Sequence, residues 1–273
     1  MKIELHCHTN FSDGKLSPRQ LSELIIKEKL DLVSVTDHDT VKAHNLIEPI
    51  MEASNIKYIP GIELTTHRNG ESIHILGYFV NDGYKNKSFL NTLDELDEFR
   101  NNRTKNILNL LEKYFGIDID YKYLRKKSKG SITRANIASE INLLFPNISH
   151  SQLFDKYLSR ESPAYIPNIN LTIEEGISLL KNNGAIVILA HPVIYQNNSI
   201  NDLLKYDFDG VECYYFLNTK EETEKYLKET KNRNLYITAG SDFHGIPNDK
   251  NHGYLSSVKY KKEDLEPFLN NFI

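Results

Sequence analysis

Two histidines flank Cys7 close to the start of the sequence, in the strand-like run KIELHCH. On a β-strand the side chains of residues i and i+2 point to the same side, so His6 and His8 can reach one metal ion while Cys7 faces the opposite way. Neutral imidazole is a common metal ligand. Taken alone the tripeptide is a weak signal, because any polar strand end can contain it.

Other histidines and carboxylates recur at or near the ends of apolar, strand-like runs. VSVT is followed by Asp37-His38-Asp39, PGIE ends at Glu63, AIVILA is followed by His191, and LYITAGS is followed by Asp242 and His244. In an α/β barrel the carboxyl ends of the strands meet at the active-site face, so these side chains are expected to converge. The candidate metal ligands are six histidines and three carboxylates: His6, His8, Asp13, His38, Glu63, His74, His191, Asp242 and His244.

This mixture of ligands indicates which metal ions could bind. Imidazole with carboxylate suits Zn, Mn or Fe better than Mg or Ca, which prefer oxygen ligands. Nine ligands exceed what one tetrahedral ion needs, so two or three divalent ions are expected. Manganese is the first candidate, with iron and zinc as alternatives, and Glu63 could bridge two ions through its two oxygens.

Strand-like and helix-like runs alternate over most of the sequence, which predicts a mostly parallel sheet covered by helices. Six or seven such units favour an α/β barrel over an open sheet. Residues 86–170 differ, because SFLNTLDELDEFRNNRTKNILNLLEKYFG has helical spacing throughout and further helix-like runs follow it. We therefore predict a barrel formed by residues 1–85 and 171–273, with residues 86–170 as a helical insertion that caps the substrate site.

Composition narrows the class of protein. The 273 residues carry a formal net charge of -4, so bulk charge does not attract nucleic acid or an anionic membrane. Two cysteines are too few for a disulfide framework. No apolar stretch approaches the roughly 18–20 residues that span a bilayer, and no signal peptide is evident. These features predict a cytoplasmic protein, with no membrane association and no obligate protein partner indicated.

The chain contains HCHTNFSDG, TDHDT, GIEL, HILGY, ITRANIA, AHP and GSDFHG in this order, and in this it resembles the polymerase and histidinol phosphatase (PHP) family. The motifs span residues 6–245. Within the family the chain is most similar to the nucleoside 3′,5′-bisphosphate phosphatases, some of which also trim short RNA from the 5′ end. The resemblance implies a distorted seven-stranded, TIM-like (β/α) barrel with a three-metal site, acting on a phosphorylated nucleotide.

The resemblance also implies how the ligands are divided among three ions. The first ion would be held by His6, His8, Glu63 and Asp242. The second would be held by Glu63, His74 and His191, and the third by Asp13, His38 and His244.

Substrate contacts are implied outside the ligand set. Arg134, in ITRANIA, would bind a substrate phosphate from the insertion. Relatives tend to carry Gly-Lys before the Pro-Ala-Tyr of SPAYIP, whereas this chain has Glu161-Ser162 with Arg160 just upstream. Arg160 and Asp37 are further candidate substrate contacts.

The predicted reaction is hydrolysis of a phosphomonoester, and no catalytic side chain is expected beyond the hydroxide that the ions supply by lowering the pKa of bound water toward about 7. Three alternatives stay open. A histidinol-phosphate phosphatase would use the same chemistry on another substrate. A metal-dependent amidohydrolase also begins with His-X-His, but its typical bridging lysine is not evident. A metal-binding or proofreading module that works with a polymerase would not need to be an enzyme.

Several remaining residues receive weaker interpretations. The basic stretch of residues 122–134 could be a lip for an oligonucleotide, but a solvated helix face is the preferred interpretation for all of it except Arg134. His252 follows the last ligand closely and could approach the site. Glu212, at a strand end, could support a ligand from behind.

Overall fold

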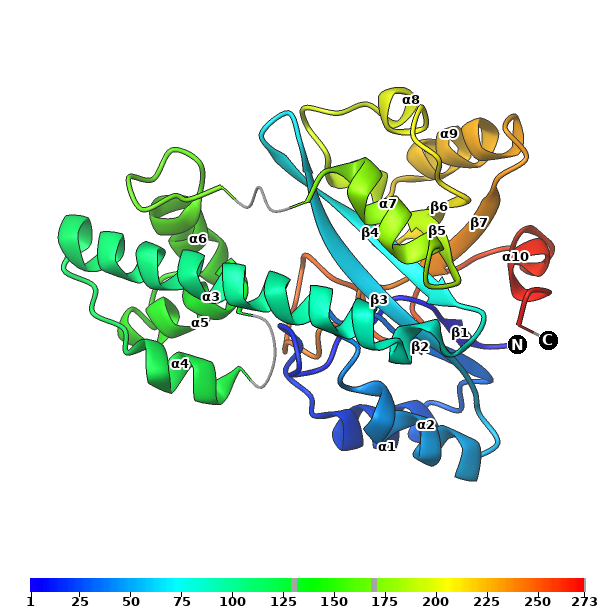
Figure 1. Ribbon diagram of the computed structural model, residues 1–273, viewed down its shortest axis with the longest axis horizontal. Helices are drawn as coiled ribbons and strands as arrows, with labels where there is room; N and C mark the ends of the chain where they lie inside the picture. The colour runs from blue at the N-terminus through cyan, green and yellow to red at the C-terminus, as the bar shows by residue number, and fades with distance from the viewer. Residues whose placement is uncertain (129–131, 168–170, 273) are drawn as a thin grey trace.

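Seven strands of the computed structural model, which describes residues 1–128, 132–167 and 171–272, form one sheet in the order of the chain (Figure 1). The strands are β1 (Ile3–Glu4), β2 (Leu32–Val35), β3 (Lys57–Arg68), β4 (Glu71–Phe79), β5 (Ala185–Leu189), β6 (Gly210–Tyr215) and β7 (Tyr236–Gly240). The pairs β1–β2, β2–β3, β5–β6 and β6–β7 are parallel, as the sequence predicts.

Strand β4 runs in the opposite direction to both of its neighbours, β3 and β5. It follows β3 through a two-residue turn in which Asn69 and Gly70 have φ values of 49° and 70°. Asn-Gly is favoured in such hairpin turns because both central residues need positive φ. The first half of β4, which carries His74, therefore lies at the edge of the sheet where the parallel strands end.

The two ends of the sheet meet through residues that follow β1 and β7. The amide of His8 donates to the carbonyl oxygen of Phe243 at 2.9 Å. The amide of Phe243 donates to the carbonyl oxygen of His6 at 3.3 Å. The regular part of β1 ends at Glu4, and residues 6–8 of the predicted strand make these closing contacts instead. The sheet is nearly closed into a barrel, which confirms the predicted TIM-like α/β fold.

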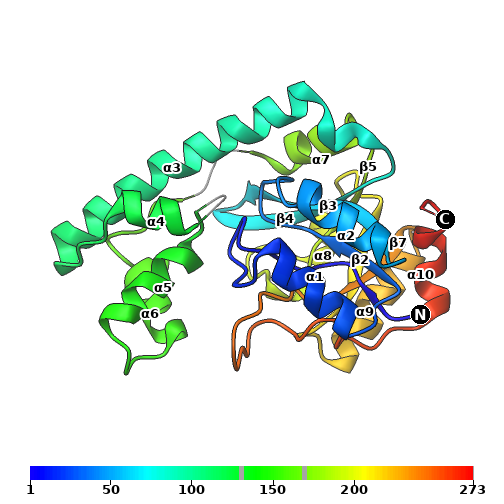
Figure 2. The ribbon, with the colours of Figure 1, turned by 90° about the horizontal axis from the view of Figure 1, so that it is seen from below.

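Helices cover the outside of the barrel (Figures 1 and 2). In the first of them, the Ser17 side chain accepts a hydrogen bond from the amide of Gln20 and Pro18 occupies the first turn, a combination typical of a helix start. These helices are α1 (Pro18–Lys27), α2 (His44–Ala53), α7 (Ile173–Lys181), α8 (Ile200–Leu203), α9 (Lys220–Lys231) and α10 (Lys262–Leu269), with short 3-10 helices η1 (Asp82–Lys85) and η2 (Pro192–Ile194). None of the described helices has the length and apolar composition needed to cross a bilayer.

The remaining helices form a cap at one side of the barrel, opposite the two chain termini (Figure 1). The cap consists of α3 (Lys87–Phe115), α4 (Tyr121–Lys127), α5 (Arg134–Leu144) and α6 (His150–Leu158). They occupy the segment predicted as a helical insertion, whose predicted last residues, 168–170, lie outside the described residues.

One helix belongs to two hydrophobic cores. The first half of α3 places Phe89, Leu93 and Leu96 in the core of the barrel. Its second half places Ile107 and Leu111 in a separate core within the cap. Because α3 is continuous, it holds the cap helices at a defined position beside the barrel edge (Figure 2).

Candidate metal centre

All nine predicted ligands lie at one edge of the barrel, each within 4.0 Å of another member of the set. Eight of them are buried, and His74 is partly exposed. Residues just beyond strand ends supply most of them: His6 and His8 after β1, His38 after β2, His191 after β5, and Asp242 and His244 after β7. Glu63 and His74 lie within the β3–β4 hairpin, and Asp13 lies in the loop before α1.

The first group consists of His6, His8, Glu63 and Asp242. The Nε2 atom of His6 lies 3.2 Å from Glu63 Oε2 and 3.3 Å from Asp242 Oδ1, and the Nε2 atom of His8 lies 3.2 and 3.1 Å from the same oxygens. All four atoms are buried, and within the described residues they form no hydrogen bond. Metal–ligand bonds of 2.0–2.2 Å place ligand atoms about 3 Å apart, so these residues fit a divalent ion.

The second group consists of Glu63, His74 and His191. The Oε1 atom of Glu63 lies 2.9 Å from His74 Nδ1 and 2.9 Å from His191 Nε2. Its Oε2 atom faces the first group and also lies 3.3 Å from His38 Nδ1. The carboxylate therefore lies between two sets of imidazoles, as a bridging ligand requires.

The third group consists of Asp13, His38 and His244, joined by His8. The Nε2 atom of His244 lies 3.1 Å from Asp13 Oδ1, and His38 Nε2 lies 3.7 Å from Asp13 Oδ2. The Nδ1–H of His244 donates to the carbonyl oxygen of Asp242 at 2.7 Å, which leaves Nε2 as the atom available to an ion. His8 and His38 thus lie near two groups each, so the three groups overlap more than the sequence resemblance implies.

Glu212 supports two candidate ligands from behind. Its Oε1 atom lies 2.9 Å from His6 Nδ1, and its Oε2 atom accepts the backbone amide of His191 at 3.0 Å. A Cβ atom at Gly240 would lie 2.3 Å from both Glu212 Oε1 and the Cβ of His6, so only glycine leaves room for this contact. Carboxylates that orient metal-binding histidines in this way strengthen their basicity.

Asp37, predicted to contact substrate, is buried and faces the protein interior. Its carboxylate accepts hydrogen bonds from the Thr9 amide (2.7 Å), the Thr9 hydroxyl (2.6 Å) and the Ser12 hydroxyl (2.7 Å). These contacts hold the loop that carries Asp13. The carboxylate of Asp37 therefore supports this loop, and among the described residues it is not one of those that line the cavity beside the candidate ligands.

Unusual backbone conformations accompany the site. Asp242 and His191 have φ values of 56° and 23°, a region that non-glycine residues rarely adopt. Such conformations persist where surrounding contacts enforce them, commonly at functional sites. Here they turn both side chains back toward the barrel edge directly after β7 and β5.

The electrostatics of the group favour positive charge among the carboxylates. Burial opposes the charge of His8, but the negative charges of Asp242 and Glu63, whose oxygens lie 3.1 and 3.2 Å from its Nε2 atom, outweigh burial and raise the pKa of His8 to about 10. Burial likewise opposes ionisation of Asp242, but the charge of His6 holds the pKa of this carboxyl well below its ordinary value. Burial lowers the pKa of His38 to about 3, so its ring is neutral and keeps a lone pair for a metal.

A cavity of about 180 Å³ connects the ligands to the cap. Asp13, His38 and His74 line its barrel side. The cap side is lined by the arginine cluster, which consists of Arg100, Arg103 and Arg134. Sequence reasoning selected only Arg134; the available signal for the other two was their i, i+3 spacing on one predicted helix, which places them on the same face.

The arginine cluster has few anionic partners. Arg100 forms an ion pair with Asp39, whereas Arg103 donates to the carbonyl oxygen of Ile166 at 2.9 and 2.7 Å. Arg134 donates to a backbone carbonyl, that of Leu158, at 3.0 Å. Within the described part of the chain, neither Arg103 nor Arg134 forms an ion pair with a carboxylate.

Arg160, the other predicted substrate contact, is exposed and lies beside Gly70 in the β3–β4 turn. It does not line the cavity, but its charge, after burial, contributes to lowering the pKa of Arg134. The structure therefore places Arg160 at the outer margin of the arginine cluster.

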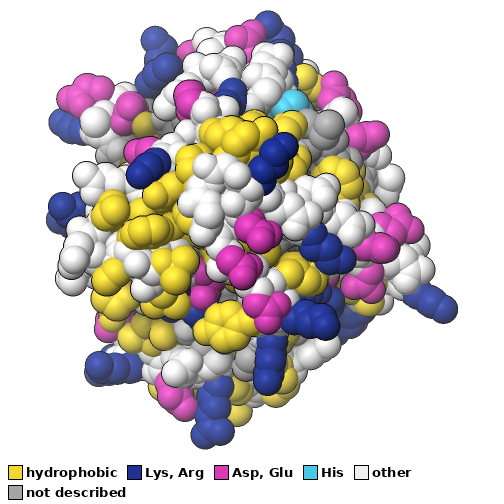
Figure 3. Space-filling view, turned by 90° about the vertical axis from the view of Figure 1, so that its left-hand side faces the viewer, with side chains coloured by type: hydrophobic (Ala, Val, Ile, Leu, Met, Phe, Trp, Pro, Cys, Tyr) yellow, Lys and Arg dark blue, Asp and Glu magenta, His cyan; other side chains and the backbone are white. Residues whose placement is uncertain are grey.

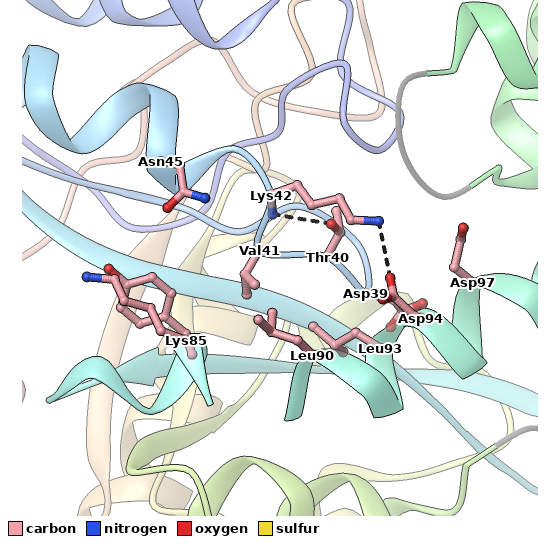
Figure 4. Close-up of a pocket in the computed structure, with 11 residues that line it drawn as sticks. Asp39, Thr40, Val41, Lys42, Asn45, Lys85, Leu90, Leu93, Asp94 and Asp97 are labelled. Carbon is pink, nitrogen blue, oxygen red and sulfur yellow. Dashed lines mark hydrogen bonds and ion pairs between the residues drawn. The ribbon is translucent and has the colours of Figure 1, made fainter. Parts of the chain in front are cut away.

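A second and larger cavity, of about 350 Å³, lies between the loop after β2 and helix α3 (Figure 4). Val41, Leu90 and Leu93 form apolar walls, and an ion pair of 3.3 Å joins Lys42 Nζ to Asp94 Oδ1 at its rim. It contains none of the nine candidate ligands. The chemistry therefore belongs to the smaller cavity.

Two cations in the basic stretch of the cap are paired with acids. Arg125 and Lys127 form ion pairs of 2.5 Å with Asp97 and Glu140, and Lys129 lies outside the described residues. Figure 3, which faces the cap end, shows Lys and Arg side chains scattered among acidic and hydrophobic ones. This arrangement fits the preferred interpretation, a solvated helix face.

The chain is similar in sequence to known proteins. The PHP domain model matches residues 4–162, more than half of the chain. A 5′-3′ exoribonuclease from Haemophilus influenzae is 28% identical over 249 residues, covering 89% of this chain and 90% of its own length. A 3′,5′-nucleoside bisphosphate phosphatase from Chromobacterium violaceum is 23% identical over 250 residues, covering 89% and 87%.

Solved structures agree with this assignment. A structure from Bifidobacterium adolescentis, assigned as a metal-dependent phosphoesterase, matches 99% of this chain and 96% of its own with a TM-score of 0.83 and 25% identity. An amidohydrolase structure from Chromobacterium violaceum covers 100% of this chain and 96% of its own with a TM-score of 0.85, and at 20% identity it shows the shared fold alone. The chain belongs to the PHP domain family and is a metal-dependent phosphoesterase, a hydrolase of phosphate esters.

Proposed function

We propose that the protein hydrolyses the P–O3′ ester bond of a 5′-phosphorylated nucleotide, with nucleoside 3′,5′-bisphosphates as the first candidate substrates. The observation that carries this proposal is the arginine cluster, which faces the candidate ligands across one cavity. A phosphate bound at the candidate metal ligands would react, and a second phosphate on the same substrate would bind to the arginine cluster. Two phosphates on one nucleotide match these two positions.

The charges of the arginine cluster support an anionic occupant. Burial, together with the neighbouring charges of Arg134 and Arg100, lowers the pKa of Arg103 to about 9. The buried guanidinium groups therefore repel one another. A phosphate dianion bound between them would relieve that repulsion. Guanidinium groups bind phosphate through two parallel charge-assisted hydrogen bonds, which fixes orientation as well as position.

We propose the three ligand groups as the sites of divalent ions, manganese first, in line with the metal dependence of the family. Such ions supply Lewis acidity and activate water. The chain itself orients the donor atoms: Glu212 holds His6, Asp37 holds the loop of Asp13, and the carbonyl of Asp242 holds His244. Two tyrosines also contact the ligands: the hydroxyl of Tyr195, directly after η2, lies 3.5 Å from His191 Nδ1, and that of Tyr215, at the end of β6, donates to Asp242 Oδ2 at 3.0 Å.

Short RNA with a 5′ phosphate is a second candidate substrate. The specific observation is that the relatives named as 5′-3′ exoribonucleases are 27–28% identical to this chain, compared with 23% for the bisphosphate phosphatase. In both reactions water adds to phosphorus, the P–O3′ bond breaks, and the 3′ oxygen takes up a proton. The two substrates differ only in whether the reacting phosphate carries another nucleotide.

A substrate panel tests the proposal. Metal-free protein is reloaded separately with Mn, Fe or Zn and assayed on adenosine 3′,5′-bisphosphate, AMP, histidinol phosphate and a 5′-phosphorylated RNA trimer. The same trimer with a 5′ hydroxyl is the matched control for the second phosphate. We expect turnover of the bisphosphate or the phosphorylated trimer to exceed that of the remaining compounds.

Two results would argue against the proposal. Faster turnover of histidinol phosphate would favour the histidinol-phosphate alternative, because that substrate has one phosphate and leaves the arginine cluster without a partner. Equal cleavage of the two trimers would show that the 5′ phosphate is not recognised.

A further inference from the structure

His252 lies in the loop after β7, outside the nine residues of the candidate ligand set. Its ring stacks on that of His244, with centroids 4.0 Å apart and planes inclined by 30°. Its Nε2 atom lies 4.0 Å from Asp242 Oδ2. His244 in turn stacks on His8 at 4.3 Å, so the three imidazoles form a continuous row that runs outward from the first ligand group.

Asp249 fixes the orientation of His252. The Nδ1 atom of His252 lies 2.7 Å from Asp249 Oδ2, and the other carboxylate oxygen accepts the amide of Asn251 at 2.9 Å. A proton on Nδ1 satisfies this hydrogen bond and leaves the lone pair of Nε2 directed toward Asp242. His6 has the same arrangement, with Nδ1 against Glu212 and Nε2 toward Asp242. Carboxylate–histidine pairs of this kind characteristically present histidine to a metal.

We infer that His252 is a further ligand of the ion at the third group, to which His244 offers its Nε2 atom, beside Asp242 at the outer edge of the cluster, and that Asp249 is its positioning residue. Potential ligand atoms of Asp242, His244 and His252 lie within 4.8 Å of one another. Imidazole with carboxylate selects a divalent transition metal. The side chain of His252 is 26% exposed and lines a cavity of about 220 Å³ with His244 and Asp249, so the outer side of this position has room for water.

The test measures metal binding in the absence of substrate. Metal-free wild type, His252→Gln and Asp249→Asn are reloaded with Co²⁺ and dialysed against graded chelator concentrations. Bound metal is then counted by elemental analysis, and the visible absorption of Co²⁺ reports its coordination. His150→Gln is the matched control, because His150 is exposed on the cap helix α6.

We expect His252→Gln to release its most weakly held ion at a chelator concentration about 10- to 100-fold lower than wild type, with a changed Co²⁺ spectrum. Asp249→Asn should shift in the same direction by a smaller factor, and His150→Gln should match wild type. Unchanged metal content and spectrum in both test variants would refute the inference. A raised KM with normal metal binding would also refute it, because His252 would then contact substrate instead.

The inference concerns the metal centre and does not depend on which phosphate ester is the substrate. The substrate panel and the metal measurement can therefore fail independently of each other. If His252→Gln does not fold, as judged by circular dichroism, the metal binding of Asp249→Asn is the test of the inference. That variant keeps the histidine and removes only the carboxylate charge.

Discussion

Arg100 on the cap helix α3 forms a buried ion pair with Asp39 on the barrel. Asp39 directly follows the candidate ligand His38, and its Oδ1 atom also accepts the amide of Thr65 at 2.7 Å. Arg100 donates to the Thr65 hydroxyl at 2.6 Å. This small network joins α3 to the loop after β2 and to β3, so the position of the arginine cluster depends on the same residues as the position of the ligands.

Loss of Arg100 should destabilise the protein. Arg100→Gln leaves the Asp39 carboxylate buried without its cation, which typically costs about 3–5 kcal/mol. Lys42→Gln is the matched control, because its partner Asp94 and Lys42 itself are largely exposed, and such pairs contribute about 1 kcal/mol or less. Urea denaturation of the metal-free proteins measures both free energies of unfolding. Similar losses in the two variants would mean that the buried pair has no special role.

Replacing one ligand of the first group should remove activity without unfolding the chain. For His8→Ala and Asp242→Asn we expect kcat to fall by about 100-fold or more, the loss typical when a catalytic constellation loses a member, together with a lower metal content. His67→Gln serves as the control, because His67 lies on β3 but outside every ligand group. A variant that keeps more than about a tenth of wild-type turnover would contradict the assignment of that ligand.

Arg134 should contribute to binding of the non-reacting phosphate of a bisphosphate substrate and not to binding of the reacting one. Removing the partner of a buried charged group costs roughly 2–5 kcal/mol, or about 30-fold to several thousand-fold in kcat/KM. Arg134→Ala should show this loss on adenosine 3′,5′-bisphosphate and a much smaller one on adenosine 3′-monophosphate. Lys122→Ala, an exposed change in the same cap, should leave both rates unchanged. Equal losses on the two substrates would place Arg134 at the reacting phosphate and end the two-phosphate model.

His44 should make stability depend on pH. Burial lowers its pKa to about 4, and its ring is neutral between the Tyr58 hydroxyl at 2.5 Å and the Gly61 carbonyl oxygen at 2.8 Å. Below the ordinary histidine pKa of about 6.5, His44 takes up a proton in the unfolded chain but stays neutral in the folded protein. The stabilisation is therefore complete above about pH 6.5 and is lost, by about 3 kcal/mol, as pH falls to about 4.

The measurement compares wild type with His44→Gln by urea denaturation between pH 4 and pH 7, both proteins metal-free. Titration of the other histidines is common to the two proteins and cancels in the difference. The stability advantage of wild type should shrink steadily as pH falls. An advantage that stays constant with pH would mean that folded His44 accepts a proton under acid conditions.

The position of the candidate ligands was predictable because strand alternation and strand ends are local features of the sequence. His6 and His8 share one side of their segment, with Cys7 in the core on the other, as i and i+2 spacing predicts. The reversal of β4 was not predicted, although Asn69-Gly70 between two strand-like runs is a hairpin signal. His74 reaches the site only because of that reversal.

Two other features depend on long-range packing. Helical spacing predicts α3, but which of its faces meets the barrel edge is decided by packing in two cores, so Arg100 and Arg103 were missed. Asp37 was selected from the sequence as a substrate contact. The hydrogen bonds that its carboxylate accepts from Thr9 and Ser12 join residues distant in the sequence, so only the folded structure shows them.

The division of α3 between two cores separates the effects of substitutions in the cap from those in the barrel. The far half of the cap is built on its own apolar contacts, so its sequence can drift without disturbing the barrel interior. The near half is tied to the barrel through Phe89 and Leu93 and through the ion pair of Arg100. Substitutions in the far half of the cap are therefore expected to leave the barrel core unaltered, whereas substitutions in the near half of α3 should disturb it.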